Sequence, residues 1–85
     1  MTSLRQLGFI FLDLETSNNK FDGDILQIAG LTTTETLAPA EEFNYLVKLE
    51  HPNRADPKIL KLIGYTDERW QSAEPLKTVL TKLYP

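Results

Sequence analysis

The sequence predicts an α+β domain in which three β-strands come first and two helices follow. Short runs of β-branched and aromatic residues recur through residues 9–47, and apolar residues take a helical spacing after Pro57. The connections between the strands are short, which favours a three-stranded antiparallel meander. No internal repeat, low-complexity tract or linker interrupts the chain, so residues 1–85 are expected to belong to one domain.

The first strand is expected over the apolar run at residues 9–12 and ends in Asp13-Leu14-Glu15. Apolar residues on both faces favour a central position in the sheet. The polar residues 16–19 that follow predict a loop.

Two further strands are expected, over residues 25–31 and 43–47. Residues 32–36 either extend the second strand or form the hairpin turn, and Pro39 leads into the third. Phe43 and Tyr45 alternate along the third strand and are expected to pack in the core.

The first helix is predicted to begin at Asp56-Pro57, because Asp accepts hydrogen bonds from free N–H groups and Pro is tolerated at the first helical position. Gly64 is expected to end it, and Trp70 is expected to fold back into the core. Four apolar residues then follow the spacing of one helix face and predict an amphipathic second helix: Leu76, Val79, Leu80 and Leu83.

The composition excludes several classes of protein. The chain has no cysteine, which rules out a disulfide framework and a thiolate metal site. No apolar run approaches the roughly 20 residues that span a bilayer, and residues 1–5 lack a signal-peptide core, so we expect a cytoplasmic protein without membrane contact. The net charge of −3 argues against a broad clamp on duplex DNA, and any nucleic acid is expected to be held locally.

Asp13 and Glu15 are the charged pair with the clearest chemistry. Residues i and i+2 of a strand share a face, so both carboxylates project together while Leu14 points the other way. A divalent cation removes their mutual repulsion, and Mg²⁺ or Mn²⁺ suits carboxylate ligands. Such ions perform two-metal phosphodiester hydrolysis. Taken alone, the short D-x-E pattern is more simply explained by two solvated carboxylates at the end of a strand.

Residues 11–16, Phe-Leu-Asp-Leu-Glu-Thr, resemble the first motif (D-x-E-T) of the DEDD-type 3′–5′ exonucleases. That superfamily includes the proofreading epsilon subunit of DNA polymerase III, RNase T and oligoribonuclease. Four further segments match the family in order: residues 25–30, 43–47, 57–66 and 74–83. The resemblance covers nearly the whole chain.

This resemblance implies an RNase H-like fold and metal-dependent release of nucleoside monophosphates from a single-stranded 3′ end, in proofreading or DNA repair. Asp13 would contact both metal ions, Mg²⁺ or Mn²⁺, and Glu15 one of them, which makes this pair the catalytic and metal-binding candidates. Thr16 would help hold the 3′-hydroxyl, and Leu14 would lie near the terminal base or sugar. DNA or RNA as substrate, and a His- or Tyr-type general base, all fit the resemblance.

The chain departs from the family pattern at several positions. Asn18 stands where Gly is frequent, and because Asn tolerates a positive φ the turn is expected to survive. Gln27 replaces a frequent Glu, and Ile63 a Thr. His51 is expected to be a solvated loop histidine, and Asp24 a solvated loop charge.

The family's remaining Asp residues and its general base lie beyond the helix that ends near Leu83. Residues 1–85 are therefore expected to be the N-terminal part of the domain, inactive alone, with the remainder of the domain or a polymerase or helicase as partner. Two alternatives are a non-catalytic module that binds nucleic acid or protein, and a truncated remnant whose exposed strand edge invites oligomerisation. The module predicts that Asp13→Ala leaves metal affinity unchanged, whereas the exonuclease predicts lost Mn²⁺ binding.

Overall fold

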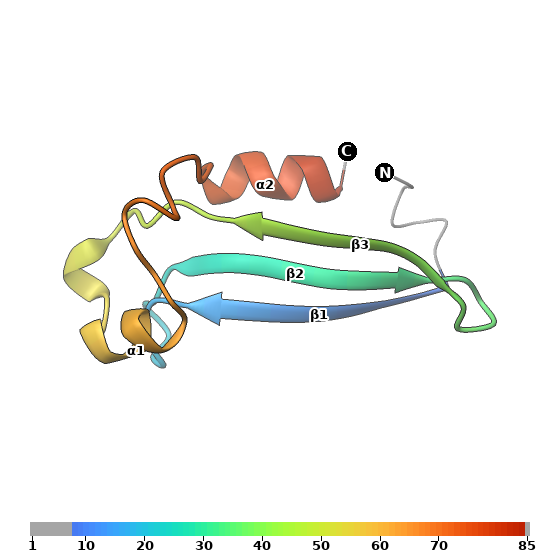
Figure 1. Ribbon diagram of the computed structural model, residues 1–85, viewed down its shortest axis with the longest axis horizontal. Coiled ribbons are helices and arrows are strands. Elements are labelled where there is room, and N and C mark those ends of the chain that lie inside the picture. The colour runs from blue at the N-terminus through green and yellow to red at the C-terminus, as the bar shows by residue number, and fades with distance from the viewer. Residues whose placement is uncertain (1–7, 85) are drawn as a thin grey trace.

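Three antiparallel strands form one sheet and two helices follow it in the computed structural model, which describes residues 8–84 (Figure 1). The elements are β1 (Phe9–Thr16), β2 (Ile25–Thr33), β3 (Pro39–Leu46), the 3-10 turn η2 (Pro52–Arg54), α1 (Pro57–Leu62) and α2 (Leu76–Leu83). The strand order is β1-β2-β3, with antiparallel pairing throughout. The predicted α+β meander with two helices is confirmed. Over residues 8–84, neither helix has the length and apolar character that crossing a bilayer requires.

β1 lies at one edge of this sheet, although a central position was predicted. The prediction relied on apolar side chains on both faces of the strand. Within residues 8–84 these side chains are exposed: Phe9, Ile10, Phe11, Leu12 and Leu14. β1 also continues through Thr16, so the loop begins at Ser17.

The turn between β2 and β3 shifts the predicted boundaries. β2 extends to Thr33, and Leu37 adopts a φ of 67° in the turn that follows, a conformation that is rare for leucine. β3 begins at Pro39, which pairs with Thr33, and not at Phe43 as predicted. Proline fits there because the first residue of an edge strand need not donate to the ladder.

α2 packs on the face of the sheet that carries Ile28 and runs along the sheet on its β3 side (Figure 1). The core cluster joins sheet and helix: Ile28, Val47, Val79 and Leu83. Phe43 and Tyr45 pack against this cluster, as predicted. The N–H of Val47 donates to the carbonyl of Leu26 at 2.8 Å, and Val47 also forms a parallel bridge with Glu74, so the segment before α2 is fastened to the sheet.

α1 begins and ends as the sequence predicts. The Asp56 side chain caps it by accepting a hydrogen bond from the N–H of Lys58 at 2.9 Å, and Gly64, at a φ of 75°, follows its last turn. Trp70 is buried, as predicted, and its indole N–H donates to the carbonyl of Leu26 at 3.0 Å. The segment between the helices is thereby tied to β2.

Candidate metal site and its supporting loops

Asp13 and Glu15 lie on the same face of β1. The strand pairing places Ala29 opposite Asp13 and Gln27 opposite Glu15. Asp13 is exposed and Glu15 is half-buried. The short side chain of Ala29 leaves the Asp13 carboxylate open on the β2 side, so both carboxylates can approach one cation from the same direction.

The chemistry of this pair fits a hard divalent cation that keeps most of its water. Mg²⁺ and Mn²⁺ are commonly bound through one or two carboxylates while water or phosphate oxygens fill the other positions. Across residues 8–84, Asp, Glu and His side chains nowhere gather into a group of three or more that could hold a metal. Any metal site at Asp13 and Glu15 would therefore rest on these two carboxylates within residues 8–84.

Leu14 lies on the opposite face of β1, away from Asp13 and Glu15. It is half-exposed and lines an apolar hollow of about 300 Å³ between β1 and α2, together with Leu80 and Tyr84. The structure therefore brings the two carboxylates together but does not bring the Leu14 side chain to them.

Thr16 ends β1 one residue after Glu15. Its hydroxyl donates to the carbonyl oxygen of Asn18 at 2.6 Å. The hydroxyl proton is thus used within the loop, and the oxygen lone pairs remain able to accept a hydrogen bond from a ligand hydroxyl.

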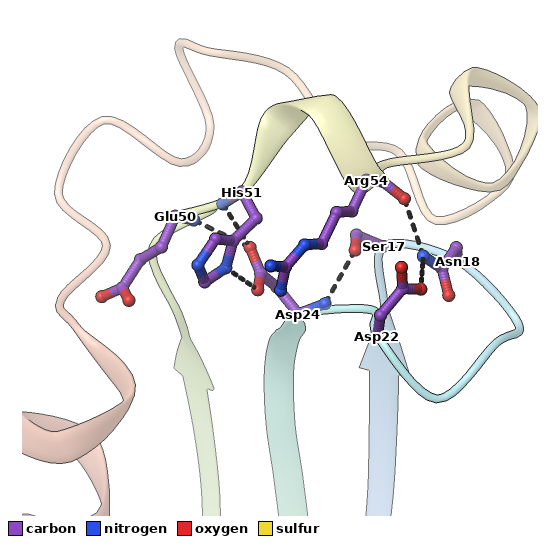
Figure 2. A network of polar contacts seen from close by, with 7 residues as sticks. All are labelled: Ser17, Asn18, Asp22, Asp24, Glu50, His51 and Arg54. Atoms are coloured by element: carbon purple, nitrogen blue, oxygen red, sulfur yellow. Dashed lines mark hydrogen bonds and ion pairs between the residues drawn. The ribbon is translucent and has the colours of Figure 1, made fainter.

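The side chain of Asn18 holds the loop that follows β1 (Figure 2). Asn18 is 5% exposed; its Nδ2 donates to Oδ1 of Asp22 at 3.1 Å and to the carbonyl of Arg54 at 2.7 Å, and its Oδ1 accepts from the N–H of Lys20 at 2.7 Å. The turn does not use the positive φ that asparagine tolerates, because among the non-glycine residues of 8–84 only Leu37 has one. Asn18 supports this turn through side-chain hydrogen bonds and not through backbone freedom.

Asp24 and His51 form a pair that was not expected (Figure 2). The His51 side chain is 45% exposed, as expected of a solvated loop histidine, whereas the Asp24 side chain is only 14% exposed. Oδ1 of Asp24 lies 2.7 Å from Nδ1 of His51, and Oδ2 accepts from the N–H groups of Glu50 at 2.9 Å and His51 at 2.7 Å. Burial by itself raises the pKa of Asp24, but the hydrogen bonds from the His51 side chain and the two N–H groups outweigh it and lower the pKa below its ordinary value. No sequence signal identified this pair, because the partners are 27 positions apart.

Ser17 connects this pair to the end of β1 (Figure 2). Ser17 is fully buried; its N–H donates to the carbonyl of Asp24 at 2.9 Å, and its Oγ accepts from the N–H of Asp24 at 2.8 Å. Its carbonyl accepts from the N–H of Asp56 at 2.8 Å. The segment just after Thr16 is therefore fixed from two sides, by the start of β2 and by the start of α1.

No protein-family model matches the chain, and no curated protein matches it. Solved structures do share its fold. A full-length 3′-exonuclease superposes with a TM-score of 0.69 and 22% identity, over 86% of this chain and 26% of that one. A 3′-exonuclease described in specific recognition of the 3′ end of a histone mRNA stem-loop superposes with a TM-score of 0.70 and 22% identity, over 86% of this chain and 35% of that one. The cell-death related nuclease CRN-4 superposes with a TM-score of 0.67 and 19% identity, over 86% of this chain and 27% of that one.

At these identities the likeness shows the fold alone. The structural relatives are 3′-exonucleases and a nuclease, as the sequence resemblance to DEDD-type exonucleases predicted. The chain spans between 26% and 35% of the length of these three structures.

Proposed function

We propose that this chain carries the first metal-binding segment of a metal-dependent 3′–5′ exonuclease, which releases nucleoside monophosphates from nucleic acid in proofreading or DNA repair. One observation carries the proposal: Asp13 and Glu15, from the D-x-E-T segment, share one face of β1. The fold in which they sit is one that solved 3′-exonucleases also have.

In this proposal Asp13 and Glu15 hold Mg²⁺ or Mn²⁺. A bound metal ion would activate the attacking water and neutralise charge at the scissile phosphate. The Thr16 oxygen accepts a hydrogen bond from the 3′-hydroxyl of the terminal nucleotide, consistent with its own proton being donated to Asn18. The proposal gives Leu14 no substrate contact, because its side chain lies on the face of β1 opposite to Asp13 and Glu15.

The proposal requires ligands and a general base beyond the two carboxylates, since residues 8–84 bring no third metal ligand to them. The partner that supplies these groups would be the remainder of an exonuclease domain or an attached polymerase or helicase. The exposed apolar side chains of β1 support such a partner, because they offer a surface for packing on both faces of the strand.

Isothermal titration with Mn²⁺ tests the proposed site. The wild-type chain should bind Mn²⁺ weakly, and Asp13→Asn and Glu15→Gln should each lose more than about tenfold in affinity, because removing even an outer partner of a metal ligand costs about that much. Glu42→Gln is the matched control, since Glu42 is exposed on β3 and shares the face of Asp13. Equal Mn²⁺ binding by all four proteins would contradict the proposal and favour a non-catalytic binding module.

A further inference from the structure

β1 forms one edge of the sheet, and within residues 8–84 it pairs with β2 alone. The outer side of an edge strand carries a row of main-chain N–H and C=O groups with which another strand can pair. Between 39% and 58% of each large apolar residue of β1 is also exposed: Phe9, Ile10, Phe11, Leu12 and Leu14. The β1 edge therefore offers both hydrogen-bonding groups and apolar surface to a further strand.

The opposite edge of the sheet is protected against such pairing. β3 begins with Pro39, which has no N–H to donate, and it carries the charged residues Glu41 and Glu42. Directly after β3, Val47 is already bridged to Glu74 of the same chain. An assembly that uses β1 alone is complete with two copies, because each copy then has no second edge with which to extend the sheet.

The two faces of β1 suit pairing with a second copy of the same strand. A twofold axis perpendicular to the sheet sets two β1 strands antiparallel and keeps the α2 face of both copies on one side. Ile10, Leu12 and Leu14 line the apolar hollow on that face, and in such a pair they meet the same three residues of the second copy. α2 itself runs along the β3 side of the sheet and not along the β1 edge (Figure 1). The joined strands thus continue one apolar face from copy to copy.

The carboxylates of β1 select one register of this pairing. Two registers use nearly the whole strand: one places Leu12 opposite Leu12 of the second copy, and the other places Asp13 opposite Asp13. Like charges directly opposite each other are destabilising, which disfavours the second register. In the first register Asp13 lies opposite Phe11 of the second copy, and Glu15 lies opposite Phe9. The register centred on Leu12 therefore leaves no two carboxylates directly opposite each other.

We propose that two copies of this chain pair antiparallel through β1, with Leu12 at the twofold axis, and form one six-stranded sheet. The exposed apolar side chains of β1 supply on the order of 900 Å² over the two copies, since half of a phenylalanine side chain is about 100 Å². With the paired main chain added, the interface approaches the roughly 1,200 Å² at the small end of specific interfaces. The dimer should therefore form reversibly and dissociate on dilution. It does not depend on the proposed metal site.

The test introduces single cysteines, because the chain has no cysteine of its own. Directly opposite residues of an antiparallel pair have Cα atoms about 4.5–5.5 Å apart, within the range of about 4.4–6.8 Å that a disulfide spans. Leu12→Cys should therefore form a disulfide-linked dimer in a glutathione redox buffer without metal ions. The rate of dimer formation is followed on non-reducing gels.

Phe11→Cys is the matched control on the same strand, because Phe11 is 57% exposed and Leu12 is 58% exposed. In the proposed register the two residues at position 11 are diagonal neighbours about 7–8 Å apart, which is too far for a disulfide without backbone movement. Leu62→Cys, on the exposed side of α1, reports random collision. Leu12→Cys should cross-link at least about tenfold faster than either control, because it alone has disulfide geometry.

Sedimentation of the unsubstituted chain checks the dimer without any substitution, and a dimer with no larger species is expected at high concentration. Equal cross-linking rates in the three variants, or the fastest rate in Phe11→Cys, would overturn the register. A chain that stays monomeric would overturn the dimer and leave the β1 edge to a strand of another protein, and larger assemblies would contradict a closed pair. Because no metal ion is present, a failure of the dimer leaves the proposed function untouched.

Discussion

Asp24 joins the start of β2 to residues 50–51 through its carboxylate and to Ser17 through its main chain. It accepts hydrogen bonds from the His51 side chain and from the N–H groups of Glu50 and His51, while its own main chain bonds to Ser17. Its side chain is 14% exposed, so these bonds are little weakened by solvent. The segment after the D-x-E-T motif depends on this residue for its position.

Replacing Asp24 should destabilise the fold in a pH-dependent way. Asp24→Ala should lower the free energy of unfolding by about 2 kcal/mol at neutral pH, the size of a hydrogen bond to a charged group. The folded-state pKa of Asp24 lies below its unfolded value of about 3.9, so this contribution is complete above the unfolded pKa and is lost as pH falls through the folded pKa. Urea unfolding of both proteins over a pH series measures the difference.

The control for this experiment is Asp67→Ala, because Asp67 is exposed and should change stability little. If the difference in unfolding free energy between wild type and Asp24→Ala stayed constant well below about pH 4, Asp24 would not act as an ionised, hydrogen-bonded carboxylate in the folded state.

The shared face of Asp13 and Glu15 could be predicted from a local pattern, whereas the polar contacts that the tertiary fold creates could not. Asp13 and Glu15 are two positions apart on one strand, so the period of a β-strand places them on one face. Asp24 and His51 meet only because the chain returns after β3, and no local spacing records that return. Asn18 shows the same limit, since its partner Arg54 is 36 positions away.

At the scale of the elements, Gly30 permits the close packing of β2 and β3. A Cβ at Gly30 would lie 2.4 Å from Cζ of Phe43 and 2.9 Å from the carbonyl oxygen of Phe11. Gly30 pairs with Phe43 across the ladder, so the aromatic ring occupies the place that a side chain would take. The ring in turn packs against the core below α2.

Gly30→Ala should therefore lower the free energy of unfolding by about 1–3 kcal/mol, the usual cost of overpacking. Phe43→Leu frees space beside position 30, so the double variant should lose less than the sum of the two single losses. Thermal or urea unfolding of the four proteins measures this coupling. If the two losses in unfolding free energy were strictly additive, the Phe43 ring would not be what restricts a side chain at position 30.

The two helices and the antiparallel pairing of the strands could be predicted because their signals are local. Asp56, Pro57 and Gly64 mark the ends of α1, and the apolar spacing marks the buried face of α2. The position of β1 could not be predicted in this way, because apolar residues on both faces reveal only what the strand can bury. The apolar residues of β1 do not reveal which element lies beside this strand.

The whole molecule is elongated, with extents of 42 × 24 × 21 Å. α2 covers the β3 side of one sheet face, whereas β1 leaves large apolar side chains exposed on both faces. β1 also contains no lysine or proline, the residues that commonly protect a sheet edge from pairing with another chain. The isolated chain should therefore self-associate.

Sedimentation over a range of protein concentrations tests this expectation. Leu12→Lys places a charge on the β1 edge and should shift the chain toward monomer. Leu62→Lys is the matched control, because Leu62 is 81% exposed on α1, outside the sheet, and the same change there should leave association as it is. A chain that stays monomeric at all concentrations, or equal effects of both variants, would contradict a role for β1.

The central claim is that Asp13 and Glu15 share a divalent cation, and paramagnetic broadening of amide NMR signals by Mn²⁺ tests it most directly. With Mn²⁺ below one equivalent, the signals of residues 13–16 should lose intensity first, while those around Asp22, Glu41 and Glu42 persist. Broadening centred on those other acidic residues, or no localised broadening, would contradict the account.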